Sequence, residues 1–199
     1  MRSYLLTFTL FILHTGLFAQ ASHDGFVTLK STETIQGQVD INAFINSAIV
    51  TTEDGRQLTY HASMIDHIAT VDECDFRRQY RCLDYRSNSF FDRLEKKIFQ
   101  VVAEGEVTLL RRVFEYDVFD ASDEYSVEEF YFLNEEQEVK KLRNFRRQVL
   151  PMMDSHAEQM MDFRERNRIV NMNRELNMYL MVSFYNRLHE LEGETLTLK

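Results

Sequence analysis

Two stretches that meet at Glu104-Gly105 alternate apolar and polar positions in the way that is typical of half-buried antiparallel strands. The first places Phe99, Val101 and Ala103 on one face. The second begins with Val107, Leu109 and Val113. We expect these two runs, within residues 97–119, to anchor the fold.

The same alternation predicts strands upstream, because residues with period two present one apolar face to a core. From Ser89 the pattern is ambiguous, and we expect a short helical or irregular piece to Glu95, followed by strand. The predicted upstream strands are Gly25–Lys30, Ile35–Ile41, Ala48–Thr52, Gln57–Tyr60 and Met64–Val71.

Asp54-Gly55 is a strong hairpin signal, since a type I′ turn needs positive φ at both central residues. A two-residue loop would place Glu53 opposite Arg56. It would also place Thr51 opposite Leu58.

After a last aromatic strand at Val127–Leu133, the apolar period changes from two to three or four, which indicates helices. A short helix is expected to end at Pro151, and Asp154 is expected to cap the next one. A longer terminal helix is marked by Ile169, Met172, Leu176, Tyr179 and the run from Val182 to Leu191.

This order predicts an α+β fold: an antiparallel twisted β-sheet or partial barrel, followed by C-terminal helices packed on it. We expect a signal peptide over residues 1–21 and a single domain over residues 22–199. Within that domain residues 25–133 are β-rich and residues 142–192 are helical.

The N-terminus has the features of a secretory signal peptide. Arg2 precedes an apolar run from Leu5 to Phe18, and Ala19-Gln20-Ala21 is a small-residue cleavage site. The run is too short and too often interrupted for a membrane span, which needs about 20 apolar residues. We therefore expect a secreted or periplasmic protein with no membrane span after cleavage.

The two cysteines, Cys74 and Cys82, are expected to form a disulfide, because thiols of exported proteins meet an oxidising compartment. Their spacing matches neither a redox C-x-x-C pair nor a zinc site.

The formal net charge of −9 makes nucleic acid an unfavourable partner, because an acidic surface repels phosphate backbones. The sequence gives neither the partner nor the oligomeric state, and it predicts no cofactor.

The chain resembles a group of uncharacterised secreted bacterial proteins. The resemblance rests on the segments Phe99–Leu109, Phe130–Leu133 and Asn144–Pro151, on a head formed by Gly25–Leu29 and Gly37–Val39, and on the pair Tyr185-Asn186. It implies export and a β-rich half followed by a helical tail. That group has no established activity, so the resemblance implies no site residues, and the segment Arg77–Arg93 fits it worst.

The most specific constellation lies in the helical part, where Met153, His156 and Met160 could supply thioether and imidazole ligands for Cu(I) or Ag(I). The alternative is packing, because methionine fills irregular cores without any metal. His61 and His67, on neighbouring β segments, could also bind a metal or act as a base.

Two further hypotheses depend on acidic residues. Four of them at positions 117–124 could hold calcium, although their spacing departs from an EF-hand loop: Asp117, Asp120, Asp123 and Glu124. A pair of carboxylates facing each other across a cleft would suit glycan hydrolysis.

No nucleophile elbow, phosphate loop or HExxH motif is present. We therefore expect an exported, non-catalytic binding or structural protein of the bacterial cell envelope. The alternative is a periplasmic protein that binds soft metals through the methionine and histidine cluster.

Overall fold

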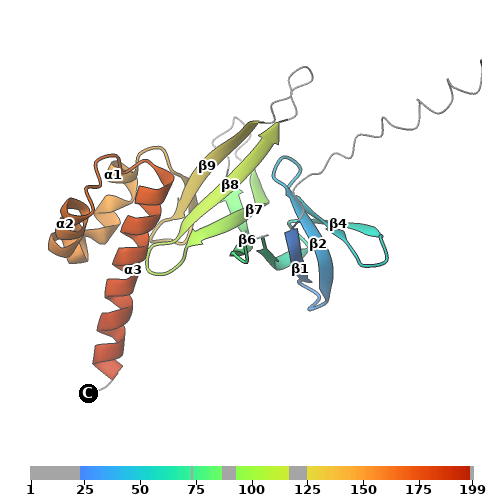
Figure 1. The fold of residues 1–199 in the computed structure, drawn as a ribbon, viewed down its shortest axis with the longest axis horizontal. Helices are drawn as coiled ribbons and strands as arrows, with labels where there is room; N and C mark the ends of the chain where they lie inside the picture. The colour runs from blue at the N-terminus through green and yellow to red at the C-terminus, as the bar shows by residue number, and fades with distance from the viewer. Residues whose placement is uncertain (1–22, 73, 87–92, 117–124, 198–199) are drawn as a thin grey trace, which may run out of the picture.

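The computed structural model describes residues 23–72, 74–86, 93–116 and 125–197 and shows a ten-stranded antiparallel sheet with helices at its C-terminal end (Figure 1). Neighbouring strands follow the order β10-β9-β8-β7-β6-β5-β1-β2-β3-β4. The strands are β1 (His23–Leu29), β2 (Thr34–Asn42), β3 (Ser47–Thr51), β4 (Gln57–His61), β5 (Ile65–Val71), β6 (Arg77–Arg86), β7 (Leu94–Ala103), β8 (Leu109–Tyr116), β9 (Tyr125–Leu133) and β10 (Val139–Lys141).

The coarse α+β prediction is confirmed, although the chain is mostly β and the sheet is open at β10 and β4. The strands predicted on either side of Glu104-Gly105 are β7 and β8. The signal peptide and the acidic segment 117–124 lie outside the described residues. In the described part of the chain, no helix is long and apolar enough to cross a membrane.

Strand β6 was not predicted, although it alternates more and less exposed positions along its whole length. Arginines and an aspartate occupy many of its positions, so apolar alternation is weak. Its inward positions on one face are Tyr80 and Cys82, which pack against the core around Ile68. Amphipathic side chains can cover a core while their polar ends reach water, which explains the missed prediction.

The β3–β4 hairpin keeps the predicted turn but shifts its register by one position. Thr51 pairs with Gln57 rather than Leu58, and the Thr52 amide donates to the carbonyl oxygen of Arg56. The loop therefore has three residues, and Gly55 closes it with φ of 79°. The predicted two-residue loop was wrong because a single glycine with positive φ suffices for a three-residue hairpin.

The sheet bends so that distant segments meet. Strand β10 lies against β6, although three strands separate them in the sheet order. The β2–β3 loop reaches β8, where the rings of Phe44 and Phe114 lie 5.2 Å apart in an edge-to-face contact. The bend also lets Arg112 on β8 donate hydrogen bonds to Ala43 and Asn46 in the β2–β3 loop.

Successive residues of a strand point to opposite faces, so β8 contributes to two cores at once. Leu109 joins the core under the helices, and Leu110 joins a core enclosed by β6–β10. The second core contains Phe99, Leu110, Tyr131, Leu133 and Val139. A third core lies between the first strands and contains Val27, Leu29, Ile35, Val39, Ala48, Val50, Ala62, Ile65, Ile68 and Ile98.

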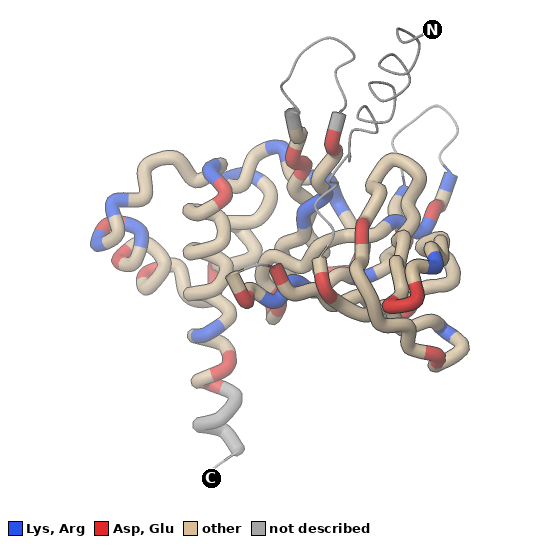
Figure 2. Tube along the Cα trace, turned by 45° about the vertical axis from the view of Figure 1, so that its right-hand side comes forward, with Lys and Arg blue, Asp and Glu red and all other residues tan. Residues whose placement is uncertain are grey.

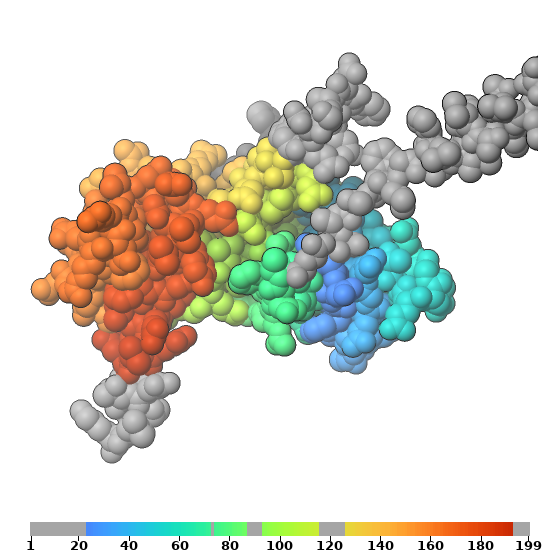
Figure 3. Space-filling model, viewed as in Figure 1, coloured from blue at the N-terminus to red at the C-terminus, as the bar shows by residue number. Residues whose placement is uncertain are grey.

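The helical part comprises α1 (Phe145–Gln148), the 3₁₀-helix η1 (Leu150–His156), α2 (Ala157–Arg166) and α3 (Glu175–Thr197). The space-filling view shows α2 and α3 as a knob at one end of the sheet (Figure 3). Pro151 lies in the first turn of η1 instead of ending a helix, because its fixed φ suits a first turn. Asp154 therefore lies inside η1 and does not cap α2, whose first flanking residue is His156.

Helix α3 begins at Glu175, later than predicted. Asn171 accepts a hydrogen bond from the Asn173 amide through its side chain, and its carbonyl oxygen accepts one from Asn177. Such local bonds compete with helix formation. Ile169 and Met172 are nevertheless buried in the core under α3, as the apolar pattern implied.

Asn186 fixes α3 to the β7–β8 turn. Its side-chain oxygen accepts from the Val107 amide at 2.9 Å, and its nitrogen donates to the carbonyl oxygens of Val107 at 2.8 Å and Glu104 at 3.1 Å. Gly105 makes this approach feasible, because a Cβ at that position would lie 2.5 Å from Cγ of Asn186. The terminal helix α3 is therefore attached to the turn between β7 and β8, the strand pair that the sequence predicted.

Candidate functional site

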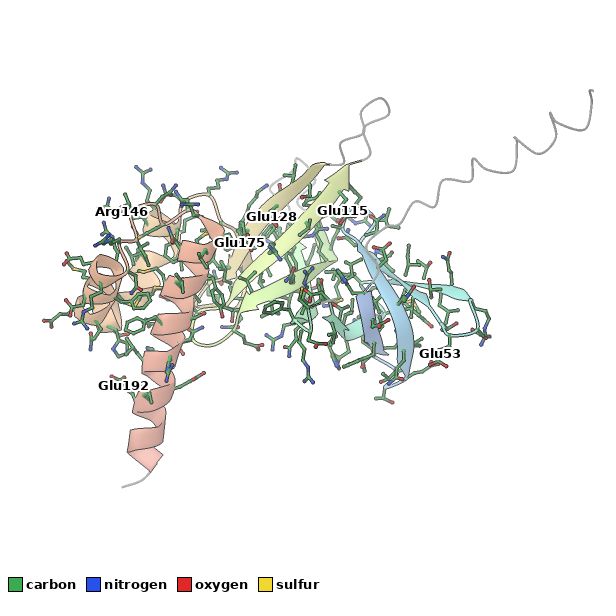
Figure 4. All side chains as sticks on the ribbon, viewed as in Figure 1. Glu53, Glu115, Glu128, Arg146, Glu175 and Glu192 are labelled. Carbon is green, nitrogen blue, oxygen red and sulfur yellow. The ribbon has the colours of Figure 1, made fainter. Side chains whose placement is uncertain are left out.

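His156 ends η1 and is buried, with 4% of its surface exposed. Its Nε2 atom lies 3.5 Å from a carboxylate oxygen of Glu192 and has no hydrogen-bond partner within the described residues. The ring of His189 lies 5.0 Å away and nearly perpendicular. Figure 4 shows Glu192 on the distal half of α3.

A second set of polar groups adjoins His156. The Tyr185 hydroxyl donates to the carbonyl oxygen of Met152 at 3.1 Å, and it lies 2.9 Å from Nε2 of His189 and 3.0 Å from Oγ of Ser155. These contacts join η1 to α3 over about 30 residues of sequence. Because the Tyr185 hydroxyl donates its proton to a backbone carbonyl oxygen, its donor is satisfied, and we interpret the network as a structural link between η1 and α3.

Met153 and Met160 are both almost completely buried in the core that η1, α2 and α3 share. On a 3₁₀-helix Met153 and His156 lie on one face, because residues three apart eclipse each other. In the part of the chain that the structure describes, no group of three or more His, Cys, Asp or Glu side chains is placed to hold a metal ion.

The predicted disulfide is wrong, because both cysteines are free. Cys74 lies exposed in the β5–β6 turn, whereas Cys82 lies well inside β6 opposite Ile98. At roughly 3.3 Å per strand residue, the five steps from the start of β6 to Cys82 already span about 16 Å. A disulfide requires Cα atoms within about 7 Å of each other. Burial raises the pKa of the Cys82 thiol to about 11.

The structure does not bring His61 and His67 together, because β4 lies at the sheet edge and pairs with β3 alone among the described strands. His61 contacts Ser63 through Nδ1 at 3.0 Å. His67 lies beside Asp66 and packs its ring against Phe26. Each histidine thus has its own local partners.

A pair of carboxylates does occur, at the junction of the sheet and α3. Arg111 Nη1 lies 3.0 Å from Glu128 and 2.5 Å from Glu175, so one guanidinium bridges β9 to α3. Figure 4 shows both labelled glutamates at this junction. Burial and the neighbouring Glu175 raise the pKa of Glu128, against the effect of Arg111. A cation between the two carboxylates makes this an ion-pair link rather than an open acid and base pair.

Sequence reasoning missed a pocket of about 280 Å³ at the mouth of the β6–β10 core. Arg112 forms its floor, and only 5% of that residue is exposed. The remaining lining comes from β6, β7, β8, β9, β10 and the β2–β3 loop: Ala43, Phe44, Asn46, Tyr85, Lys97, Phe114, Glu129, Tyr131 and Lys141.

Arg112 carries a buried charge that the described residues do not neutralise by a contact ion pair. Its Nη2 donates to the carbonyl oxygen of Ala43 and to Oδ1 of Asn46, both neutral acceptors. Its Nε is buried without a hydrogen-bond partner, and its guanidinium lies 4.8 Å from the ring centre of Phe114. Burial lowers the pKa of Arg112, which expresses the cost of keeping this charge away from water.

Three other charged side chains line the same pocket: Lys97, Glu129 and Lys141. Lys97 lies over the ring of Tyr85 at 5.0 Å, and its nearest carboxylate oxygen, on Glu95, is 3.8 Å away. Burial and the charge of Arg112 lower the pKa of Lys97. Two like charges therefore oppose each other across a partly dry pocket.

Glu129 provides the negative group of the pocket. It accepts hydrogen bonds from the hydroxyl of Tyr131 and from Nζ of Lys141. Burial alone would raise the pKa of Glu129, but these two bonds, together with the charges of Lys141 and Arg112, outweigh it and lower the pKa overall. Burial and the adjacent Glu129 raise the pKa of Tyr131, so that its hydroxyl keeps the proton it donates.

Elsewhere on the molecule, basic and acidic residues are interspersed along both the sheet and the helices (Figure 2). Comparison with known proteins adds no function: no family model, no curated protein and no solved structure matches this chain. The functional argument therefore depends on the residues themselves.

Proposed function

We propose that this chain is an exported, non-catalytic binding protein of the bacterial cell envelope, and that it binds a small anionic ligand in the Arg112 pocket. Export is inferred from the order of charged, apolar and small residues at the N-terminus. Binding is inferred from one observation, the buried guanidinium of Arg112, whose hydrogen bonds within the described residues go to neutral oxygens of Ala43 and Asn46.

An unpaired buried charge costs several kcal/mol unless it is compensated, so natural cores rarely keep one without a use. Concave pockets with a few convergent polar groups are the usual sites of small ligands. The Arg112 pocket combines both properties. Its volume of about 280 Å³ suits a small molecule rather than a polymer.

Thermal unfolding of the mature protein, residues 22–199, with small anions tests this function. A ligand at a hundred times its Kd stabilises by about 2.7 kcal/mol, which raises Tm by roughly 5–10 °C for a chain of this size. Arg112→Gln and Lys97→Gln should each reduce the shift by about half or more, because a ligand bound tenfold more weakly at the same concentration stabilises by only about 1.4 kcal/mol. Lys96→Gln is the matched control, because Lys96 precedes Lys97 on the opposite face of β7 and pairs with Asp84. Equal shifts in all four proteins would refute the site.

The soft-metal alternative is favoured by a separate observation: Nε2 of buried His156 makes no hydrogen bond within the described residues and lies 3.5 Å from Glu192, in the same helical part as buried Met153 and Met160. Thioether and imidazole ligands suit Cu(I) and Ag(I). Titration of the mature protein with either ion, beside a His156→Ala, Met160→Leu variant, tests it. Tight binding that the variant loses would support metal handling, and absence of binding would leave these methionines as core residues.

A further inference from the structure

The Arg112 pocket contains more than a positive charge, and the arrangement of its groups restricts the ligand. Arg112 and Lys97 carry like charges that repel each other, and Glu129, the carboxylate of the same pocket, attracts both while it accepts its hydrogen bonds from Tyr131 and Lys141. An anion between them would be attracted by both and would reduce their mutual repulsion. A planar carboxylate matches a guanidinium especially well.

Glu129 makes the pocket selective, because it is a fixed negative acceptor at the same site. The bonds to Tyr131 and Lys141 hold its carboxylate in place. An ionised carboxylate has about four lone-pair sites, so Glu129 can accept another donor. A ligand that presents only deprotonated oxygens, such as sulfate, would meet repulsion there, whereas a hydroxyl or ammonium group would donate a hydrogen bond to Glu129.

The walls of the pocket favour a ligand with a carbon body. Phe44, Phe114 and Tyr85 contribute aromatic surface, and half of the surface of Phe44 is exposed at the rim. Apolar contact with such rings contributes to binding in proportion to the area removed from water. A compact tetrahedral anion would leave that surface unused.

We propose that the ligand is a small organic carboxylate with a hydroxyl or ammonium donor beside its acid group, held by Arg112 and Lys97 at the carboxylate and by Glu129 at the donor. This inference rests on the proposed function, since it names the ligand class of the same pocket.

Isothermal titration of the mature protein with matched ligands tests the inference. One set comprises propionate, lactate and alanine, and a larger set comprises glutarate, 2-hydroxyglutarate and glutamate. Within each set the members differ in the group beside the carboxylate, so the hydroxyl and ammonium forms are distinguished directly. Sulfate serves as an oxyanion without a donor.

We expect at least one donor-bearing ligand to bind roughly tenfold or more tightly than its donor-free parent, a difference of about 1.4 kcal/mol. Lys97→Gln and Arg112→Gln should each weaken that ligand roughly tenfold or more, and Lys96→Gln should leave it unchanged. Glu129→Gln should reduce the preference for the donor while it leaves the parent ligand within about threefold. If Arg112→Gln does not fold, Lys97→Gln carries the test, because its side chain retains some exposure.

The other outcomes separate the two proposals. Sulfate binding most tightly, with loss in Lys97→Gln, would retain the anion-binding function and overturn the carboxylate inference. Equal binding of parent and donor-bearing ligands would overturn it as well. If no probe binds, both proposals fail.

Discussion

Replacing Asn186 by alanine should be among the most destabilising single changes on α3. The side chain is 5% exposed and makes three hydrogen bonds with Glu104 and Val107. At about 1 kcal/mol each, their loss costs about 3 kcal/mol. The buried amide of Val107 then lacks a partner, which adds about 1 kcal/mol or more.

The expected loss of about 4 kcal/mol corresponds to a decrease in Tm of roughly 8–16 °C. Urea unfolding followed by circular dichroism measures the free energy directly. Asn177→Ala is the matched control, since Asn177 lies on the same helix but is only partly buried and donates a single hydrogen bond to Asn171. Asn186→Asp keeps the shape, removes both donors and places a charge near two carbonyl oxygens, so it should be no milder than alanine at pH 7.

The reasoning would be refuted if Asn186→Ala lowered the unfolding free energy no more than Asn177→Ala. It would also be refuted if Asn186→Asp were as stable as the wild type. Either result would mean that the helix docks on the sheet through apolar contacts alone.

Gly105→Ala should destabilise the fold by about 2 kcal/mol or more, because the new Cβ would clash with Asn186. Gly55→Ala has open space around the new Cβ, so it should cost only about 1 kcal/mol of backbone strain. Glu129→Gln should lower stability at pH 7, and the loss should vanish as pH falls: the pKa of Glu129 is below its ordinary value of 4.5, so its contribution is full above that value and is lost as pH falls through the folded pKa. Iodoacetamide should modify Cys74 quickly and Cys82 very slowly at pH 8, because the thiolate is the nucleophile and the pKa of Cys82 is raised to about 11.

Each of these has a clear contrary result. Equal losses for the two glycine variants, measured by urea unfolding, would remove the steric argument. A pH-independent cost of Glu129→Gln would show that its charge is not involved. Equal labelling rates in mass spectrometry, or protection of both thiols without reductant, would contradict the free cysteines.

Alternation of apolar residues sufficed to predict most strands, because burial of one face is a local property that each strand shows by itself. The pair β7 and β8 shows this most clearly, since Phe99 and Leu109 are both fully buried. The hairpin at Gly55 was located but misregistered, because loop length depends on the conformation of one residue. Strand β6 escaped because its arginines obscure the alternation.

The pocket could not be predicted, because its lining comes from five strands and a loop that lies about 70 residues from Arg112. One signal was nevertheless available in β8. Leu110, Arg112 and Phe114 share one face, so a charged residue occupies a position whose neighbours are apolar. The histidine and methionine cluster was found because all its members lie within one short segment. Whether it binds a metal depends on the spatial arrangement of sulfur and nitrogen atoms.

Strand β1 lies between β2 and β5, so seven residues join the ladder of β2–β4 to the ladder of β5–β10. Under mechanical load, a force applied at the first residue of β1 would break its hydrogen bonds with both β2 and β5 and would divide the sheet into two. Arg112 forms a second connection between the two groups of strands, since its hydrogen bonds join β8 to the loop between β2 and β3. A ligand held by Arg112 would therefore bind where the two groups of strands meet and would raise the force needed to separate them.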